Sequence, residues 1–161
     1  MAYTERASVV KVREALEERG VEAELVELEE TARSAREAAA ALGRRVEQIV
    51  KSLVFRGKRS GRPLLVLAGG ANRVDEKRVS ALFGEELEKA DADFVRGETG
   101  FSIGGVPPVI PGGQPPTILD EDLLEEDEVW AAAGHTHVVF GLHPEELLRI
   151  TGAKAARVSR R

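Results

Sequence analysis

Apolar residues recur at helical spacing in four stretches of the chain: residues 5–19, 34–43, 75–84 and 144–152. In the first stretch Val9, Val12 and Leu16 would share one face of a helix, and Gly20 follows as a stop signal. The second begins with Ser34 and has Glu37 three residues later, a pattern typical of a capping box. We therefore expect four helices, each bounded by recognisable start or stop residues.

Other stretches have the pattern of β-strands. Residues 49–55, IVKSLVF, form a nearly continuous apolar run, and after a Gly/Arg-rich turn residues 64–67 form another, so the pair predicts a hairpin. Residues 21–28 alternate between apolar and polar side chains. Three later runs, at 117–119, 129–133 and 137–142, are also short and apolar. Because strands and helices mix without strict alternation, we expect one mixed α/β domain over residues 1–161, built around a curved sheet.

Composition is that of an ordinary globular protein, with 161 residues, 42% hydrophobic and 32% charged. The absence of cysteine rules out disulfides, thiolate metal sites and a cysteine nucleophile, and is consistent with a reducing compartment. The amino-terminal MAYTERASVV carries charges before any apolar run, so it does not resemble a signal peptide. No apolar run is long enough to cross a membrane. We expect a cytoplasmic protein without a membrane partner.

Charge is unevenly distributed along the chain, whose net charge is −5. Residues 51–79 contain eight bases and two acids, whereas residues 120–128 contain seven acids and no base. A polyanion responds to the electrostatic potential of the nearest part of the protein surface. One face of this protein could therefore bind phosphates although its net charge is negative. Solvated turns would give the same pattern, and charge alone does not separate the two interpretations.

Lys51 is the most informative single residue. In a strand it would share one face with Ile49, Leu53 and Phe55, while the opposite face is also mostly apolar. The ammonium must therefore be paired or must reach a cavity or the end of the strand. Beside a pocket it could bind phosphate, neutralise an oxyanion or act as a base with a lowered pKa. A structural lysine that extends its stem over the core is the alternative.

Residues 100–116, GFSIGGVPPVIPGGQPP, contain ten glycines and prolines in seventeen positions. The stretch has neither the glycine spacing of a dinucleotide site nor the Gly-Lys-Ser/Thr of a phosphate loop. Gly104 and Gly105 can take positive φ and allow close approach to the backbone, while Pro107 and Pro108 stiffen the chain after them. These properties suit a rigid loop that presents N–H groups to a carbonyl or carboxylate. A tight surface connection is the alternative.

Other residues suggest chemistry more weakly. His135 and His137 would lie on one face of a strand, but no third ligand stands at a telling spacing, so no metal site is predicted. The acids at 120–128 are interpreted as a solvated helix end. Three residues have hydroxyls without an evident base: Ser52, Ser102 and Thr136. Two aromatic residues, Phe101 and Trp130, are more typical of the core.

Several blocks together resemble the YbaK/EbsC-type aminoacyl-tRNA deacylases, relatives of the editing domain inserted in bacterial prolyl-tRNA synthetases. The resemblance covers nearly the whole chain. It is carried, in order, by IVKSLVF, VLAGGANRVDEKRV, ADADFVRGETGFSIGGVPPV, ILDEDLL and VWAAAGHTHVVFGLHPEELLRITGA. The resemblance implies a single compact domain with a six-stranded, mixed, barrel-like sheet flanked by helices.

The resemblance also implies a function and a site. The activity would be hydrolysis of the ester that joins a wrong amino acid to tRNA, without metal, cofactor or covalent protein nucleophile. The family's characteristic lysine falls on Lys51, and its Gly-x-x-x-Pro loop falls on Gly104 to Pro108. We expect substrate-binding residues at Gly100, Phe101, Ser102, Gly104, Gly105 and Pro108. We expect contacts with the tRNA acceptor end at Arg56, Lys58 and Arg73.

The implied mechanism needs little from the protein, because an aminoacyl ester is already activated. Backbone N–H groups near Gly104 and Gly105 would hold the carbonyl, and Lys51 would contact the terminal ribose or phosphate or offset the developing charge. The substrate's own ribose hydroxyl could activate the water, and pocket size would exclude the larger, correct amino acid.

The sequence leaves three points open. Relatives often continue the loop with Gly-His where this chain has Ile110–Pro111, so its second half is expected to be reshaped. A module that binds tRNA or aminoacyl groups without catalysis is the main alternative to an enzyme, and a small-molecule hydrolase lacks a recognisable nucleophile. The amino acid removed, the need for a synthetase partner and the oligomeric state are not predicted.

Overall fold

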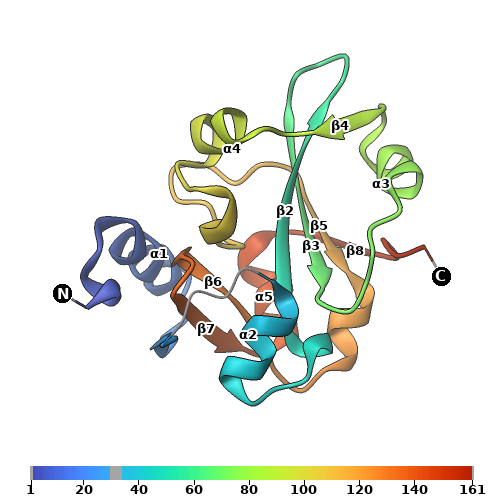
Figure 1. The fold of residues 1–161 in the computed structure, drawn as a ribbon. Helices are drawn as coiled ribbons and strands as arrows, with labels where there is room; N and C mark the ends of the chain where they lie inside the picture. Colours follow the sequence, from blue (N-terminus) through green and yellow to red (C-terminus); the bar gives the residue numbers. More distant parts are fainter. Residues whose placement is uncertain (1, 30–33, 161) are drawn as a thin grey trace.

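The computed structural model describes residues 2–29 and 34–160, which form a mixed α/β domain (Figure 1). The helices are α1 (Ala7–Glu18), α2 (Ala35–Leu42), α3 (Glu76–Phe83), α4 (Ala92–Thr99) and α5 (Pro144–Thr151). The strands are β1 (Leu25–Glu27), β2 (Val50–Gly57), β3 (Pro63–Gly69), β4 (Leu87–Lys89), β5 (Thr117–Asp120), β6 (Val129–His135), β7 (Val138–Leu142) and β8 (Lys154–Ala156). Short 3₁₀ turns are η1 (Tyr3–Glu5), η2 (Val46–Gln48), η3 (Ile103–Gly105) and η4 (Glu121–Glu125).

The described strands form two sheets. One has the order β1-β7-β6 and is antiparallel; the other has the order β4-β2-β3-β5-β8. In the larger sheet β2 is antiparallel to both β3 and β4, whereas β5 is parallel to β3 and to β8. One parallel bridge, between Ile49 and Trp130, connects the start of β2 to β6.

This arrangement corrects the expected sheet. The described strands divide into three and five rather than forming one six-stranded sheet, and no closed barrel is found among the described residues. The sheets do not merge because the bridge to β6 is made by Ile49, just before β2, and the outer edge of β2 next meets a described strand at Phe55, which pairs with β4. The segment η3 and this unpaired part of β2 both line one pocket, which is described below.

The four helices predicted from sequence are confirmed as α1, α2, α3 and α5, and the expected N-caps of α2 and α3 form. The Ser34 hydroxyl accepts from the Glu37 N–H at 3.1 Å, and Asp75 accepts from the N–H groups of Lys77 and Arg78. Pro144 stands in the first turn of α5. The predicted hairpin is also confirmed, as β2 and β3 pair along seven positions from Val50–Gly69 to Arg56–Pro63.

Two hydrophobic clusters pack on opposite faces of the larger sheet. Val50, Leu65 and Leu67 face the main cluster, which includes residues of α1, α5, β6 and β7. Phe55, Leu64 and Val66 face a smaller cluster covered by α3. Figure 1 shows the β2–β3 hairpin extending from between these layers past β4. No described helix has the length and apolar character that a membrane span requires.

Candidate functional site

A pocket of about 270 Å³ lies along the unpaired edge of β2. Its walls come from the first turn of α2, from η3 and from the β6–β7 hairpin. The lining residues include Lys51, Ser52, Gly104, Trp130, His135 and Thr136. Residues from three other parts of the chain thus meet beside one strand, and the predicted Lys51 and Gly104 are among the residues that line the pocket.

The strand edge itself contributes polar groups to this pocket. The Ile49 carbonyl accepts from Gly70 N–H (2.7 Å) and the Gly57 N–H donates to the Arg62 carbonyl (2.9 Å), so odd-numbered residues of β2 point their backbone groups toward β3. Strand alternation then directs the N–H and C=O of Ser52 to the open edge. The Ser52 hydroxyl is also buried, and it makes no hydrogen bond within the described chain.

Lys51 extends from β2 to the turn that follows β3. Its Nζ donates to the Asn72 carbonyl at 2.5 Å. Burial lowers the pKa of Lys51, and the negative charge of Asp120 opposes that shift. An ammonium has three donors, so one contact with Asn72 leaves two for a substrate. The side chain is therefore held at the pocket wall by a structural partner, as expected for a residue that must be paired.

Asp120 organises the turn that receives Lys51. This side chain is only 1% exposed, and its Oδ2 accepts from the Gly69 N–H (2.9 Å) and from the Asn72 side-chain amide (2.8 Å). The interpretation of residues 120–128 as a solvated helix end is thus wrong for Asp120. Its burial was hidden because six other acids surround it in the sequence.

The two glycines of η3 are required by close packing. An added Cβ on Gly104 would lie 2.6 Å from the Thr136 methyl carbon, and one on Gly105 would lie 3.0 Å from the Gly134 carbonyl. Neither residue has the positive φ that the sequence suggested. The Gly105 N–H donates to the Ser102 carbonyl at 2.9 Å, whereas the Gly104 N–H donates to no described residue. Of these two glycines, Gly104 is therefore the one whose N–H is available for a ligand.

The other predicted substrate residues have different positions. Gly100 ends α4 with φ of 83°, Phe101 is buried in the main core, and Ser102 is exposed. Pro108 is buried, and its carbonyl accepts from the Gln114 amide at 2.9 Å. None of these four residues lines the pocket. Their expected role in substrate binding stays a prediction, and the structure gives them positions that support the loop.

Gln114 holds the second half of the Gly/Pro stretch. Its side-chain oxygen accepts from the Ile110 N–H (2.9 Å), and its amide nitrogen also donates to the Thr117 hydroxyl (3.0 Å). The amide thus fastens residues 108–114 to the start of β5. The segment around Ile110–Pro111 is accordingly a shaped turn, with Ile110 only 1% exposed.

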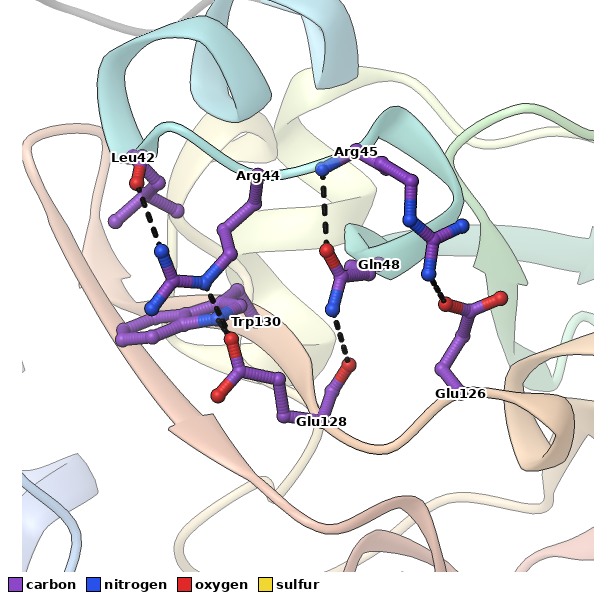
Figure 2. Close-up of polar contacts among 7 residues, drawn as sticks. All are labelled: Leu42, Arg44, Arg45, Gln48, Glu126, Glu128 and Trp130. Atoms are coloured by element: carbon purple, nitrogen blue, oxygen red, sulfur yellow. Dashed lines mark hydrogen bonds and ion pairs between the residues drawn. The ribbon is translucent and has the colours of Figure 1, made fainter.

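Trp130 forms an aromatic wall of the pocket and is fixed by polar contacts outside it (Figure 2). Its indole N–H donates to Glu128 Oε1 at 3.0 Å, and the same carboxylate pairs with Arg44, whose guanidinium lies 5.5 Å from the centre of the indole ring. The hydrogen bonds from Trp130 and Arg44 lower the pKa of Glu128. The indole also packs against Gly141, its cross-strand partner, where an added Cβ would come within 2.9 Å of the ring.

His135 and His137 lie at the β6–β7 turn and contact Tyr3. The Tyr3 ring centre is 4.6 Å from that of His135 and 4.3 Å from that of His137. His135 Nδ1 accepts from the His137 N–H at 3.0 Å, so this nitrogen carries no proton. Burial and the neighbouring His137 and Arg6 lower the pKa of His135. Within residues 2–29 and 34–160, no cluster of three metal-ligating side chains occurs.

The predicted tRNA-contacting residues are divided between two ends of β2. Arg73 follows Asn72 in the turn that binds Lys51, whereas Arg56 and Lys58 lie toward the hairpin tip. There Arg56 pairs with Glu88 at 3.9 Å and Lys58 with Glu86 at 3.7 Å. These acidic residues in and next to β4 thus neutralise part of the positive charge of residues 51–79. Contact of these three residues with tRNA stays a prediction.

Comparison with known proteins supplies the family. A model of the aminoacyl-tRNA editing domain matches residues 29–150, which is most of the chain and includes Lys51, Gly104 and Trp130. The chain belongs to the aminoacyl-tRNA editing domain family. The resemblance noted from sequence is therefore confirmed.

Three relatives place the chain within this family. It is 30% identical over 133 residues to the uncharacterized protein YwhH of Bacillus subtilis (strain 168), covering 83% of this chain and 84% of that protein. It is 28% identical over 127 residues to the "Putative Cys-tRNA(Pro)/Cys-tRNA(Cys) deacylase EbsC" of Enterococcus faecalis (strain ATCC 700802 / V583), covering 78% and 77% of the two chains. A crystal structure described as "a putative trans-editing enzyme for prolyl tRNA synthetase" is 46% identical, with a TM-score of 0.90 and coverage of 97% and 99%.

Proposed function

We propose that this editing-domain protein hydrolyses the ester of mischarged aminoacyl-tRNA in trans, with Lys51 and Gly104 at the reaction centre. The observation that carries the proposal is their meeting in one pocket: a lysine from β2 and a free backbone N–H from η3, in a chain of this family. A charged donor and a fixed backbone donor are the groups that stabilise a tetrahedral oxyanion.

The proposed reaction proceeds by direct attack of water. The water oxygen adds to the ester carbonyl carbon, and the carbonyl oxygen becomes an oxyanion that accepts from the Gly104 N–H and from Lys51. The water loses one proton as it attacks, the bond from the carbonyl carbon to the ribose oxygen breaks, and that ribose oxygen takes up the proton as the free amino acid leaves. The neighbouring ribose hydroxyl assists the water, so the protein supplies mainly position and charge.

The hydroxyls of the pocket support a mechanism without a covalent intermediate. A serine or threonine nucleophile needs a base within hydrogen-bond reach. The Ser52 hydroxyl has no partner in the described chain, and the Ser34 hydroxyl caps α2. Thr136 Oγ1 lies 3.5 Å from His137 Nδ1, which is longer than a normal hydroxyl hydrogen bond. Replacing Thr136 by Val should therefore leave deacylation largely intact.

The test is a panel of mischarged tRNAs incubated with the protein, with ester loss followed over time. The proposal predicts that at least one member loses its amino acid faster with protein than in buffer, while the correctly charged counterpart is spared. If no member is accelerated but tRNA still binds, the protein is a binding module rather than an enzyme. Adding a prolyl-tRNA synthetase in a parallel series tests whether a synthetase partner changes the rate.

A further inference from the structure

Residues 134–137, where β6 turns into β7, form a tight turn on which η3 is seated. An added Cβ on Gly105 would lie 3.0 Å from the Gly134 carbonyl oxygen. One on Gly104 would lie 2.6 Å from the methyl carbon of Thr136. Both glycines of η3 are thus in direct contact with this β6–β7 turn. The place of the Gly104 N–H, the proposed oxyanion donor, therefore depends on where the turn lies.

The β6–β7 turn is also held by the amino-terminal part of the chain. Helix α1 packs against β6, and an added Cβ on Gly134 would lie 2.7 Å from the carbonyl oxygen of Ser8. Gly134 has φ of 96°, a left-handed conformation that favours glycine. The turn is therefore in close contact with α1 as well as with η3. Because packed interiors transmit strain, a shift of the turn would move η3 with it.

Tyr3 adds a further contact by covering two histidines of this turn. Its ring stacks on that of His137, with 4.3 Å between the ring centres and 9° between the ring planes. It also meets the ring of His135, which lines the pocket, at 4.6 Å. The Arg6 guanidinium lies 5.3 Å from the centre of the same Tyr3 ring. Ring pairs at these distances have a preferred geometry, so Tyr3 restrains the orientation of both imidazoles.

The segment that carries Tyr3 is itself fixed by two other elements. The Thr4 N–H donates to Glu27 Oε1 of β1 at 3.0 Å. The Thr4 carbonyl accepts from the Arg13 side chain of α1 at 3.0 Å. Tyr3 also packs against the main hydrophobic cluster. Its ring is therefore a firmly held support for the turn.

We propose that Tyr3 is a positioning residue for the reaction, because it supports the β6–β7 turn on which η3 and the Gly104 N–H are seated. This inference rests on the proposed function. Tyr3 precedes residues 29–150, which match the editing-domain model, so the support comes from a part of the chain outside that match. Tyr3 does not line the pocket and acts through the two histidines of the turn.

The first experiment measures this support without a substrate. The Gly105 N–H donates to the Ser102 carbonyl, so its hydrogen exchange reports whether η3 stays in place. Tyr3→Ala removes the ring, whereas Tyr3→Phe keeps the contacts that the ring makes. The matched control is Phe83→Ala. Phe83 is also half-buried and lies beside a guanidinium, that of Arg62 at 5.1 Å, but it does not line the pocket.

The proposal predicts a selective effect on η3. The Gly105 N–H should exchange at least about tenfold faster in Tyr3→Ala than in Phe83→Ala, and Tyr3→Phe should match the wild type. Wild-type exchange in Tyr3→Ala, or an acceleration equal to that in Phe83→Ala, would show that the ring does not support η3 and would overturn the proposal. If Tyr3→Ala does not fold, Tyr3→Leu, which fills the space without a flat ring, is used with the same criterion.

A kinetic measurement connects this support to the reaction. On a mischarged tRNA, Tyr3→Ala should lower kcat by about tenfold and leave KM within about twofold, because a misplaced oxyanion donor weakens transition-state binding and leaves tRNA binding intact. Tyr3→Phe should retain the wild-type kcat. Unchanged kcat in Tyr3→Ala would refute the positioning role, and a rise in KM in its place would assign Tyr3 to tRNA binding. Faster Gly105 exchange in Tyr3→Ala, with no deacylation by the wild type, would refute the proposed function and leave the support of η3 standing.

Discussion

Ser52 shows a conflict between stability and function at the level of one side chain. Its hydroxyl is buried without a partner, and such a group costs about 1–3 kcal/mol when it is removed from water. Ser52→Ala should therefore raise the free energy of unfolding by about 1 kcal/mol, as measured by urea denaturation. The same change should lower the rate of deacylation several-fold.

The control for Ser52 is Ser102→Ala, because Ser102 is exposed and its side chain caps no helix. Loss of stability in Ser52→Ala would mean that the hydroxyl has a structural partner and is not held ready for the substrate. Sequence drew attention to Ser52 as a hydroxyl without a base, but burial and the open strand edge could be seen only in the folded chain.

His135 provides a pH prediction. Its pKa is lowered in the folded protein, so below the ordinary value of about 6.5 the unfolded chain binds more protons than the folded chain. The contribution of neutral His135 to stability is present above that pH and is lost as pH falls toward the lowered pKa. The melting temperature should thus decrease between about pH 6.5 and 5 in the wild type, and less in His135→Gln. Equal pH dependence of both proteins would contradict this role.

At the scale of elements, the packing of β6 on β7 fixes the aromatic wall of the pocket. Gly141→Ala puts a methyl group within 2.9 Å of the Trp130 ring. We expect a loss of about 1–3 kcal/mol in unfolding free energy, as is usual for an overpacked site. Trp130 is the only tryptophan in the chain, so its fluorescence should report the displaced ring directly.

The matched control is Gly97→Ala, since Gly97 lies inside α4 and an added Cβ there meets no atom within 4 Å. This change should stabilise the protein by about 0.5–1 kcal/mol through helix propensity. An unchanged emission spectrum in Gly141→Ala, with unchanged stability, would show that the indole is not confined by β7.

Elements with strong patterns could be predicted from sequence, and those made by tertiary contacts could not. The β2–β3 hairpin and the caps of α2 and α3 follow from apolar runs and from Ser34 and Asp75. Helix α4 was missed because ADFVRGET contains a glycine and few apolar residues. The two-sheet arrangement was missed because strand pairing on the outer edge of β2 is interrupted between Ile49 and Phe55. That interruption depends on residues distant in sequence.

The candidate site divides in the same way. Lys51 and Gly104 were singled out by the strand pattern and the Gly/Pro stretch and then by the family resemblance, and they lie together in the pocket, whereas Phe101 and Pro108 are buried outside its lining. Ser52 matters through an open strand edge and Asp120 through a buried turn. Trp130 matters through Arg44, which is distant in sequence, lies over the indole ring and pairs with Glu128. No local spacing encodes those relations, so only the folded structure shows them.

At the scale of the whole molecule, charge predicts how tRNA binding responds to salt. If Arg56, Lys58 and Arg73 contact phosphates, affinity should fall as salt rises, and replacing all three by Gln should reduce the slope of log affinity against log salt by about 2. Lys154→Gln, at the start of β8, is the control and should leave the slope unchanged. An affinity that is flat between low and moderate salt would show that phosphate contacts are few.

The central claim is that Lys51 stabilises the transition state of ester hydrolysis. Its most direct test is single-turnover deacylation of a mischarged tRNA by the wild type, Lys51→Ala and the surface control Lys154→Ala. We predict that Lys51→Ala keeps its fold and tRNA affinity but loses at least about 100-fold in rate, while Lys154→Ala equals the wild type. A Lys51→Ala protein that deacylates at the wild-type rate would contradict this role of the lysine.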